Sequence, residues 1–324
     1  MKQAAQISTI ASANIAINFL FQWYVLKQLG AGFETDSFIA GLTIPQILLA
    51  IINGALVQVL IPIFTSKDVF QRQLEACSLI AFVGAIIACV CIIIFLTTTF
   101  WLDLIVPGFD EFRRKLTIDI INIQLISVVF ASINAIQIAV YHAQQKFLFT
   151  ESISIIASFI SFLLLIWLLP QFGVIAAAWC ITLRIVLQFL ILSSFIEKLV
   201  WPDIKNPVIA LTWERIKPLL FGSTYYMADP IIDRLLLSTA SIGSLSLYNF
   251  AQQIYGALSE IINKSVGAPL ITRLTKLYKE EDIEGFKQAY RIKLRKIIWF
   301  SLFLIFLLIA LGENIISIFI DNRE

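Results

Sequence analysis

The sequence predicts an all-α, polytopic membrane protein: a bundle of about nine transmembrane helices. Of its 324 residues, 59% are hydrophobic and 14% are charged, whereas soluble domains average about 45–50% apolar and about 25% charged residues. The mean hydropathy is +0.87. Apolar residues gather in runs of about 20 or more, the length that crosses a bilayer as a helix. A cytosolic enzyme, a nucleic-acid binder and a disordered scaffold are therefore excluded as first interpretations.

Nine segments are long and apolar enough to span a membrane. They cover residues 5–29, 37–64, 76–105, 116–142, 148–169, 173–196, 217–241, 245–273 and 294–320. Most connections between them are short and contain glycine or proline, as at Gly30, Pro107, Pro170 and Gly243. Such turns are typical of helical hairpins.

Two connections are longer than the rest. The first, a cytoplasmic linker at 198–216, is predicted to separate an N-terminal six-helix lobe at 1–197 from a partial second lobe of three helices at 217–324. The second, at 274–293, is charged and is predicted to form an amphipathic helix on the cytoplasmic membrane surface.

The distribution of Lys and Arg predicts the orientation. With a cytoplasmic N-terminus, the inside segments hold sixteen of these residues and the outside segments hold five. Cytoplasmic loops of membrane proteins carry such an excess of positive charge. We therefore expect a multi-pass protein of the cytoplasmic (inner) membrane with its N-terminus inside.

Polar side chains recur on one face of several spans. Asn14 and Asn18 lie four residues apart on the first span, so they share a face. Asp229 and Asp233 have the same spacing on the seventh span, with Arg234 beside them. Two further spans carry charge within the predicted membrane segment: the sixth has Arg184, and the eighth has a stripe that includes Gln253, Glu260 and Lys264.

These polar groups have two possible roles. Asn and Gln inside membranes commonly join helices through hydrogen bonds of about 0.6–2 kcal/mol each. A charged side chain costs about 2.5–3.5 kcal/mol or more near the bilayer centre, so it needs a partner or a water-filled cavity. Structural pairing and cavity lining therefore both remain open for the charged residues.

No constellation of catalytic or metal-binding residues stands out. The four cysteines lie inside apolar runs without a CxxC pair, and the single histidine, His142, falls at a predicted helix end. The sequence contains no recognisable carboxylate pair or nucleophile elbow. We expect a protein that is not an enzyme and that has no cofactor and no metal site.

Several short motifs resemble those of the MurJ/MviN family of lipid II flippases. Residues 30–38 read GAGFETDSF, and the helix that they open ends in Ile61-Pro62-Ile63-Phe64. Pro107-Gly108-Phe109 and Ala268-Pro269-Leu270 also match, and the order holds over essentially the whole chain. The resemblance implies the fold of the multidrug/oligosaccharidyl-lipid/polysaccharide exporter superfamily, with two six-helix lobes around a central cavity. It also implies alternating access and transport of a polyprenyl-pyrophosphate-linked saccharide in cell-wall or polysaccharide biosynthesis.

The resemblance places Asp36 at a functional family position, which we interpret as the outer gate. The family's cavity arginines are replaced here by the uncharged Phe21, Leu49-Ala50 and Gln253. Pyrophosphate binding would then use other residues, namely Arg184, Arg234 and Lys264 with Asn14, Asn18 and Gln253. The acids Asp229, Asp233 and Glu260 would balance these charges or bind a coupling cation.

The family pattern implies three more helices than the nine predicted here. The sequence ends at Glu324, and we interpret it as C-terminally truncated, with a partner chain as one possible source of the missing helices. Two other functions stay open: a cation-coupled small-molecule antiporter of the same fold, and a non-transporting scaffold derived from a flippase.

Overall fold

The computed structural model describes residues 2–194, 201–203, 205–226 and 228–262, with 274, 277, 282–292, 294–295, 298–299, 301–302 and 305–306. Every element within these residues is a helix. Five of the helices are long and apolar enough to cross a membrane. In chain order the elements are α1 (Lys2–Leu29), α2 (Phe33–Thr65), α3 (Val69–Ile105), α4 (Glu111–Ala143), α5 (Phe147–Ser194), α6 (Pro207–Tyr226), α7 (Ala228–Ser238) and α8 (Ser244–Ile262).

The first six predicted spans are all present, because α5 contains two of them. Gly173 interrupts α5 with a φ of 59° and a ψ of −150°, a conformation that glycine adopts without the clash of a Cβ. The Ser161 hydroxyl, before this break, donates to the backbone oxygen of Cys180, after it, at 2.7 Å. The two arms of α5 therefore fold back against each other.

The second half of the linker predicted at 198–216 forms the start of α6, and its role as a linker between lobes stays a prediction. Asn206 caps this helix, since its Oδ1 accepts a hydrogen bond from the Val208 backbone N–H at 3.0 Å. Pro207 takes the first helical position, where its missing N–H costs nothing. Val208, Thr212 and Ile216 are all buried, and their four-residue spacing turns one face of α6 inward.

The seventh span is predicted over 217–241. The second half of α6 and helix α7, which ends at Ser238, occupy most of these positions, with residue 227 outside the described part of the chain. The span therefore stays a prediction.

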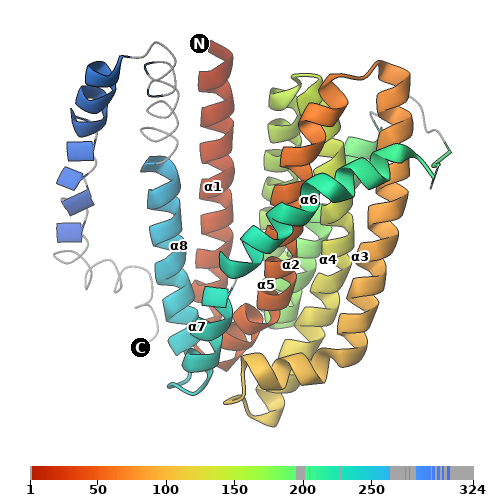
Figure 1. The fold of residues 1–324 in the computed structure, drawn as a ribbon. Helices are drawn as coiled ribbons and strands as arrows, with labels where there is room; N and C mark the ends of the chain where they lie inside the picture. Colours follow the sequence, from red (N-terminus) through yellow and green to blue (C-terminus); the bar gives the residue numbers. More distant parts are fainter. Residues whose placement is uncertain are drawn as a thin grey trace. The chain divides into compact units, whose positions relative to one another are not determined.

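Helix α4 is the centre of the first five helices and packs along α2, α3 and α5. Figure 1 shows these helices running beside one another, with α6 crossing them obliquely. Three polar side chains of α4 bind backbone oxygens of the second arm of α5: Gln124 to Ala178 at 2.7 Å, Asn134 to Ile185 at 3.0 Å and Tyr141 to Leu192 at 2.9 Å. On α4, the structural role of membrane amides is therefore confirmed.

The chain divides into two compact units, residues 1–247 and 248–324. The second unit contains most of α8 and a helix over residues 283–292, within the amphipathic segment predicted at 274–293. The position of that segment on the membrane surface stays a prediction, as does the division into lobes at 1–197 and 217–324. The ninth predicted span, 294–320, lies mostly outside the described residues.

Candidate transport site

Asp36 lies in the first turn of α2 and is only 2% exposed. The turn that leads into α2 contains Gly30 with a φ of +74°. The Thr35 hydroxyl stabilises this turn, because it accepts from the Gly32 N–H at 3.0 Å and donates to the Gly30 oxygen at 2.9 Å. The sequence around the glycines thus holds the Asp36 carboxylate in one position.

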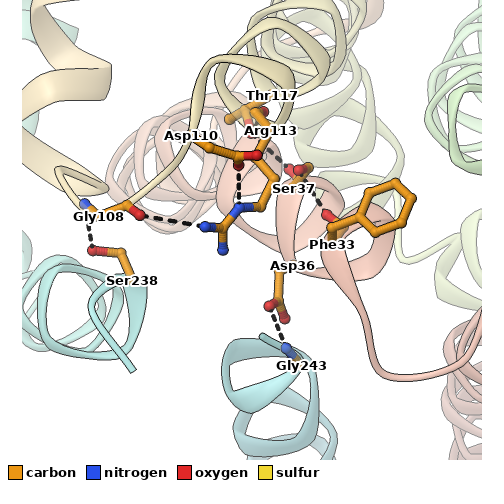
Figure 2. Close-up of polar contacts among 9 residues, drawn as sticks. All are labelled: Phe33, Asp36, Ser37, Gly108, Asp110, Arg113, Thr117, Ser238 and Gly243. Atoms are coloured by element: carbon orange, nitrogen blue, oxygen red, sulfur yellow. Dashed lines mark hydrogen bonds and ion pairs between the residues drawn. The ribbon is translucent and has the colours of Figure 1, made fainter. Parts of the chain in front are cut away.

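The Asp36 carboxylate binds the start of α8, a segment more than 200 residues further along the chain. Its Oδ2 accepts from the Gly243 N–H at 2.6 Å, and its Oδ1 accepts from the Ser246 N–H at 2.9 Å and the Ser246 hydroxyl at 2.5 Å. Figure 2 shows Asp36 directed at Gly243. The first N–H groups of a helix have no partner within it and attract negative charge. We call Asp36, Thr35, Gly243 and Ser246 the Asp36 latch, and the end of the helices where it lies the Asp36 end.

A second contact joins the α3–α4 turn to the end of α7 at the same Asp36 end. The Gly108 N–H donates to the Ser238 hydroxyl at 3.4 Å, and a methyl group at Gly108 would overlap the Ser238 backbone oxygen. Arg113 donates to Asp110 at 2.5 Å and to the Gly108 oxygen at 3.4 Å (Figure 2). The hydrogen bond from Arg113 lowers the pKa of Asp110. The Arg113–Asp110 ion pair therefore persists at neutral pH and is lost on strong acidification.

Gly243→Ala should separate the two turns that meet at the Asp36 end. Gly243 has a φ of +89°, and a Cβ there would lie 2.7 Å from the Ala31 backbone oxygen. Gly30 is the matched control, because its φ is also positive but no atom lies within 4 Å of a Cβ built there. Both variants should lose about 1–2 kcal/mol to backbone strain. Only Gly243→Ala should lengthen the distance between spin labels at Phe112 and Ala240, measured by electron paramagnetic resonance in a cysteine-free background. Equal label distances in the two variants would contradict a close contact.

A polar cluster joins α1 to both arms of α5, in the predicted membrane segments. Arg184 Nη1 donates to Asn18 Oδ1. Asn18 Nδ2 donates to the Asn14 backbone oxygen at 2.9 Å, and Asn14 Nδ2 donates to the Ser154 hydroxyl at 3.1 Å. We call Arg184, Asn18, Asn14 and Ser154 the Arg184 cluster. Three of the predicted binding residues are therefore brought together.

Arg184 is half-buried. Within the described part of the chain, no carboxylate lies within ion-pair distance of it. The Arg184 guanidinium binds the amide of Asn18 and not the acids of α7. A cation held in this way keeps its charge available to an anion.

The other predicted residues are placed as follows. On α7, Arg234 is buried, Asp233 is half-buried and Asp229 is exposed. On α8, Gln253 donates to Asn249 at 3.3 Å. The Glu260 side chain and Lys264 lie outside the described residues. Among the described residues, no group of three or more His, Cys, Asp or Glu is arranged to hold a metal ion.

The partners of Asp36 could not be found from sequence. The segment Gly243-Ser244-Leu245-Ser246 carries a recognisable helix-start signal, a turn residue before serines. That signal does not reveal which distant carboxylate would bind the helix start. Gly108 belongs to a motif that resembles the family, but neither it nor Ser238 signals their contact, because that contact depends on how the turns pack.

Comparisons with known proteins agree with this architecture. The family model described as lipid II flippase MurJ matches residues 25–322. A solved structure of lipid II flippase MurJ in an inward closed conformation has a TM-score of 0.83 at 18% identity, covering 98% of this chain and 67% of that chain. The chain thus spans about two thirds of that structure.

Two other transporters share the fold at lower similarity. An inward-facing multidrug resistance MATE family transporter of the MOP superfamily has a TM-score of 0.71 at 14% identity, covering 98% of this chain and 75% of that chain. A MOP superfamily transporter from Pyrococcus furiosus has a TM-score of 0.63 at 13% identity, and the match covers 99% of this chain and 74% of that chain. The expected all-helical membrane transporter fold is confirmed. Because the family model covers most of the sequence, the chain belongs to the MurJ family of lipid II flippases, which are multi-pass transporters of the inner membrane.

Proposed function

We propose that this chain moves a polyprenyl-pyrophosphate-linked saccharide from the inner to the outer leaflet of the cytoplasmic membrane by alternating access. Lipid II or a related cell-wall or polysaccharide precursor is the implied cargo. The family supports this class of substrate. The observation that carries the proposal is the Arg184 cluster, a cation in a membrane span that no described carboxylate neutralises.

The Arg184 cluster suits a pyrophosphate headgroup chemically. A guanidinium presents several N–H donors in a planar fork that matches phosphate oxygens. Asn18 accepts a hydrogen bond from one guanidinium nitrogen of Arg184, Nη1. The remaining N–H donors of the guanidinium can bind an anion. An unneutralised charge in a membrane span is costly, so its presence there favours a functional role. In this proposal Arg184 takes over the part of the cavity arginines that the chain lacks.

The Asp36 latch would act as the outer gate. With the N-terminus inside, the Asp36 end faces outward. The latch joins α2 to the start of α8, which come from the two predicted lobes. All of its bonds must break before cargo can leave toward the outer leaflet. While the latch is formed, the protein would receive cargo from the inner side only.

The remaining predicted residues complete the proposed pathway. Arg234 and Lys264 would add positive charge for the headgroup, and Gln253 would bind its saccharide hydroxyls. Asp229, Asp233 and Glu260 would balance these charges or bind a coupling cation. Any further helices, from the same chain or from a partner, would complete the second lobe.

The proposal is tested by lipid retention, measured by native mass spectrometry on the protein from its own membrane, with a polyprenyl pyrophosphate as the probe. Arg234→Ala combined with Lys264→Ala should lower retention by about tenfold or more, since charge-assisted hydrogen bonds contribute about 1.5–3 kcal/mol each. Lys115→Ala, an exposed cation at the Asp36 end, is the control and should have no effect. Unchanged retention in the double variant would contradict the assignment of this chain as a pyrophosphate-lipid transporter.

A second candidate is a cation-coupled antiporter for small molecules. The observation in its favour is the placement of Asp229 and Asp233 on α7 in positions that are not fully buried. Efflux of a small cationic probe from vesicles that follows a proton or sodium gradient would support it. Transport of the pyrophosphate lipid with no efflux of the small probe would favour the flippase.

A further inference from the structure

Positive charge recurs every four residues in and just after the helix over residues 283–292. Lys287 and Arg291 lie on this helix, Arg295 lies in the helical residues 294–295 beyond it, and all three are exposed. In a regular helix this spacing places three side chains within about 80° of one another. We call these three residues the basic stripe. The helix begins at Asp282, whose Oδ1 accepts from the Gly285 N–H at 2.8 Å.

One residue opposite the basic stripe is buried. Ala289 is 8% exposed and lies on the side away from the basic stripe. Asp282 and Glu284 place the negative charge at the start of the helix, and Glu284 is the acid on the same face as Lys287. Within the described residues the basic stripe forms no ion pair. Its positive charge is therefore free to bind an external anion.

Exposed aromatic residues within and after the basic stripe are typical of a position beside the membrane. Trp299, one turn beyond Arg295, is 68% exposed, and Tyr290 is 46% exposed. Exposed Trp and Tyr of membrane proteins gather at the level of the lipid headgroups. The next predicted span begins at residue 294, and the predicted orientation puts this junction at the cytoplasmic leaflet, where anionic lipids make the surface negative.

We propose that the basic stripe is a binding surface for anionic phospholipid headgroups of the inner leaflet. The phosphate of the headgroup would lie against the three side chains, with Trp299 at the acyl boundary. This inference does not depend on the proposed transport function, since it rests on the charge, the exposure and the position of this helix together with the predicted orientation. A nucleic acid fits less well, because the stripe adjoins an apolar span.

Native mass spectrometry of the purified chain, titrated with phosphatidylglycerol or with phosphatidylcholine of the same acyl chains, tests this surface. The native protein should retain phosphatidylglycerol preferentially. In the triple variant Lys287→Gln, Arg291→Gln and Arg295→Gln, the preference for phosphatidylglycerol over phosphatidylcholine should fall about fivefold for each charge removed. Because the three side chains are exposed, the variant should keep its melting temperature.

The matched control exchanges the cations but keeps their charge: Lys287→Arg, Arg291→Lys and Arg295→Lys. It should retain phosphatidylglycerol as the native protein does, and both should lose it as salt is raised. Millimolar inorganic phosphate should not compete, since it lacks the acyl chains. Equal retention of the two lipids by the native protein, or unchanged preference in the glutamine variant, would overturn the proposal.

Discussion

Replacing Asp36 with alanine should open the Asp36 end of the protein and abolish most of its transport. The carboxylate accepts three hydrogen bonds from Gly243 and Ser246, and alanine would leave two backbone N–H groups at a helix start without an acceptor. Charge-assisted hydrogen bonds contribute about 1.5–3 kcal/mol each. A net loss of about 3 kcal/mol would lower the population of the latched state more than a hundredfold.

The label pair at Phe112 and Ala240 measures this opening directly. Asp36→Ala should broaden the distance distribution and shift it to longer values. Glu34→Gln is the matched control, because Glu34 is an acid in the same turn of α2 that forms none of the hydrogen bonds of the Asp36 latch. It should leave the distances unchanged. A narrow, native distance in Asp36→Ala would mean that packing at Gly108, and not the carboxylate, holds the turns together.

Arg184→Gln should weaken retention of a polyprenyl pyrophosphate by about tenfold or more and leave the fold intact. Glutamine can still donate a hydrogen bond to Asn18, but it carries no charge for the anion. Removing a cation that no described carboxylate neutralises also lifts the cost of holding it in a membrane span. We therefore expect an unchanged or higher melting temperature together with weaker lipid binding.

Two further variants separate a binding role of Arg184 from a structural one. Arg184→Lys keeps the charge but lacks the planar fork, so it should retain the pyrophosphate at an intermediate level. Asn14→Leu removes the tie to Ser154 and should lower the melting temperature more than it lowers retention. If Arg184→Gln lowered the melting temperature while retention stayed native, Arg184 would serve only to join α1 and α5.

The helices of this fold were predictable to the extent that hydropathy determines them. The six spans up to residue 196 are apolar for longer than a bilayer crossing, and the structure has all of them. The region after residue 200 mixes polar and apolar residues, so hydropathy alone placed the start of α6 about ten residues late. The correct signal was Asn206-Pro207, a helix cap followed by a proline at the first helical position.

The candidate site was predictable in its parts and not in its connections. Asn14, Asn18 and Arg184 were each recognisable as polar groups inside membrane spans, yet their hydrogen bonds cross between α1 and α5. Asp36 was suggested by its motif, but its partners depend on a turn more than 200 residues away. Local sequence determines caps and breaks, whereas contacts between distant turns follow from packing.

The ties from α4 to α5 have a consequence for which sequence changes this protein can accumulate. The backbone oxygens that accept them, at 178, 185 and 192, are spaced seven residues apart. Seven residues make almost two helical turns, so the ties run along a single seam. Every amino acid supplies a backbone oxygen, so the alignment of the two helices survives exchange of the acceptor residues for others of similar size. The donors on α4 are side chains, so they cannot be exchanged freely. Substitutions along this seam should therefore accumulate on α5 and be rare at the donor positions of α4.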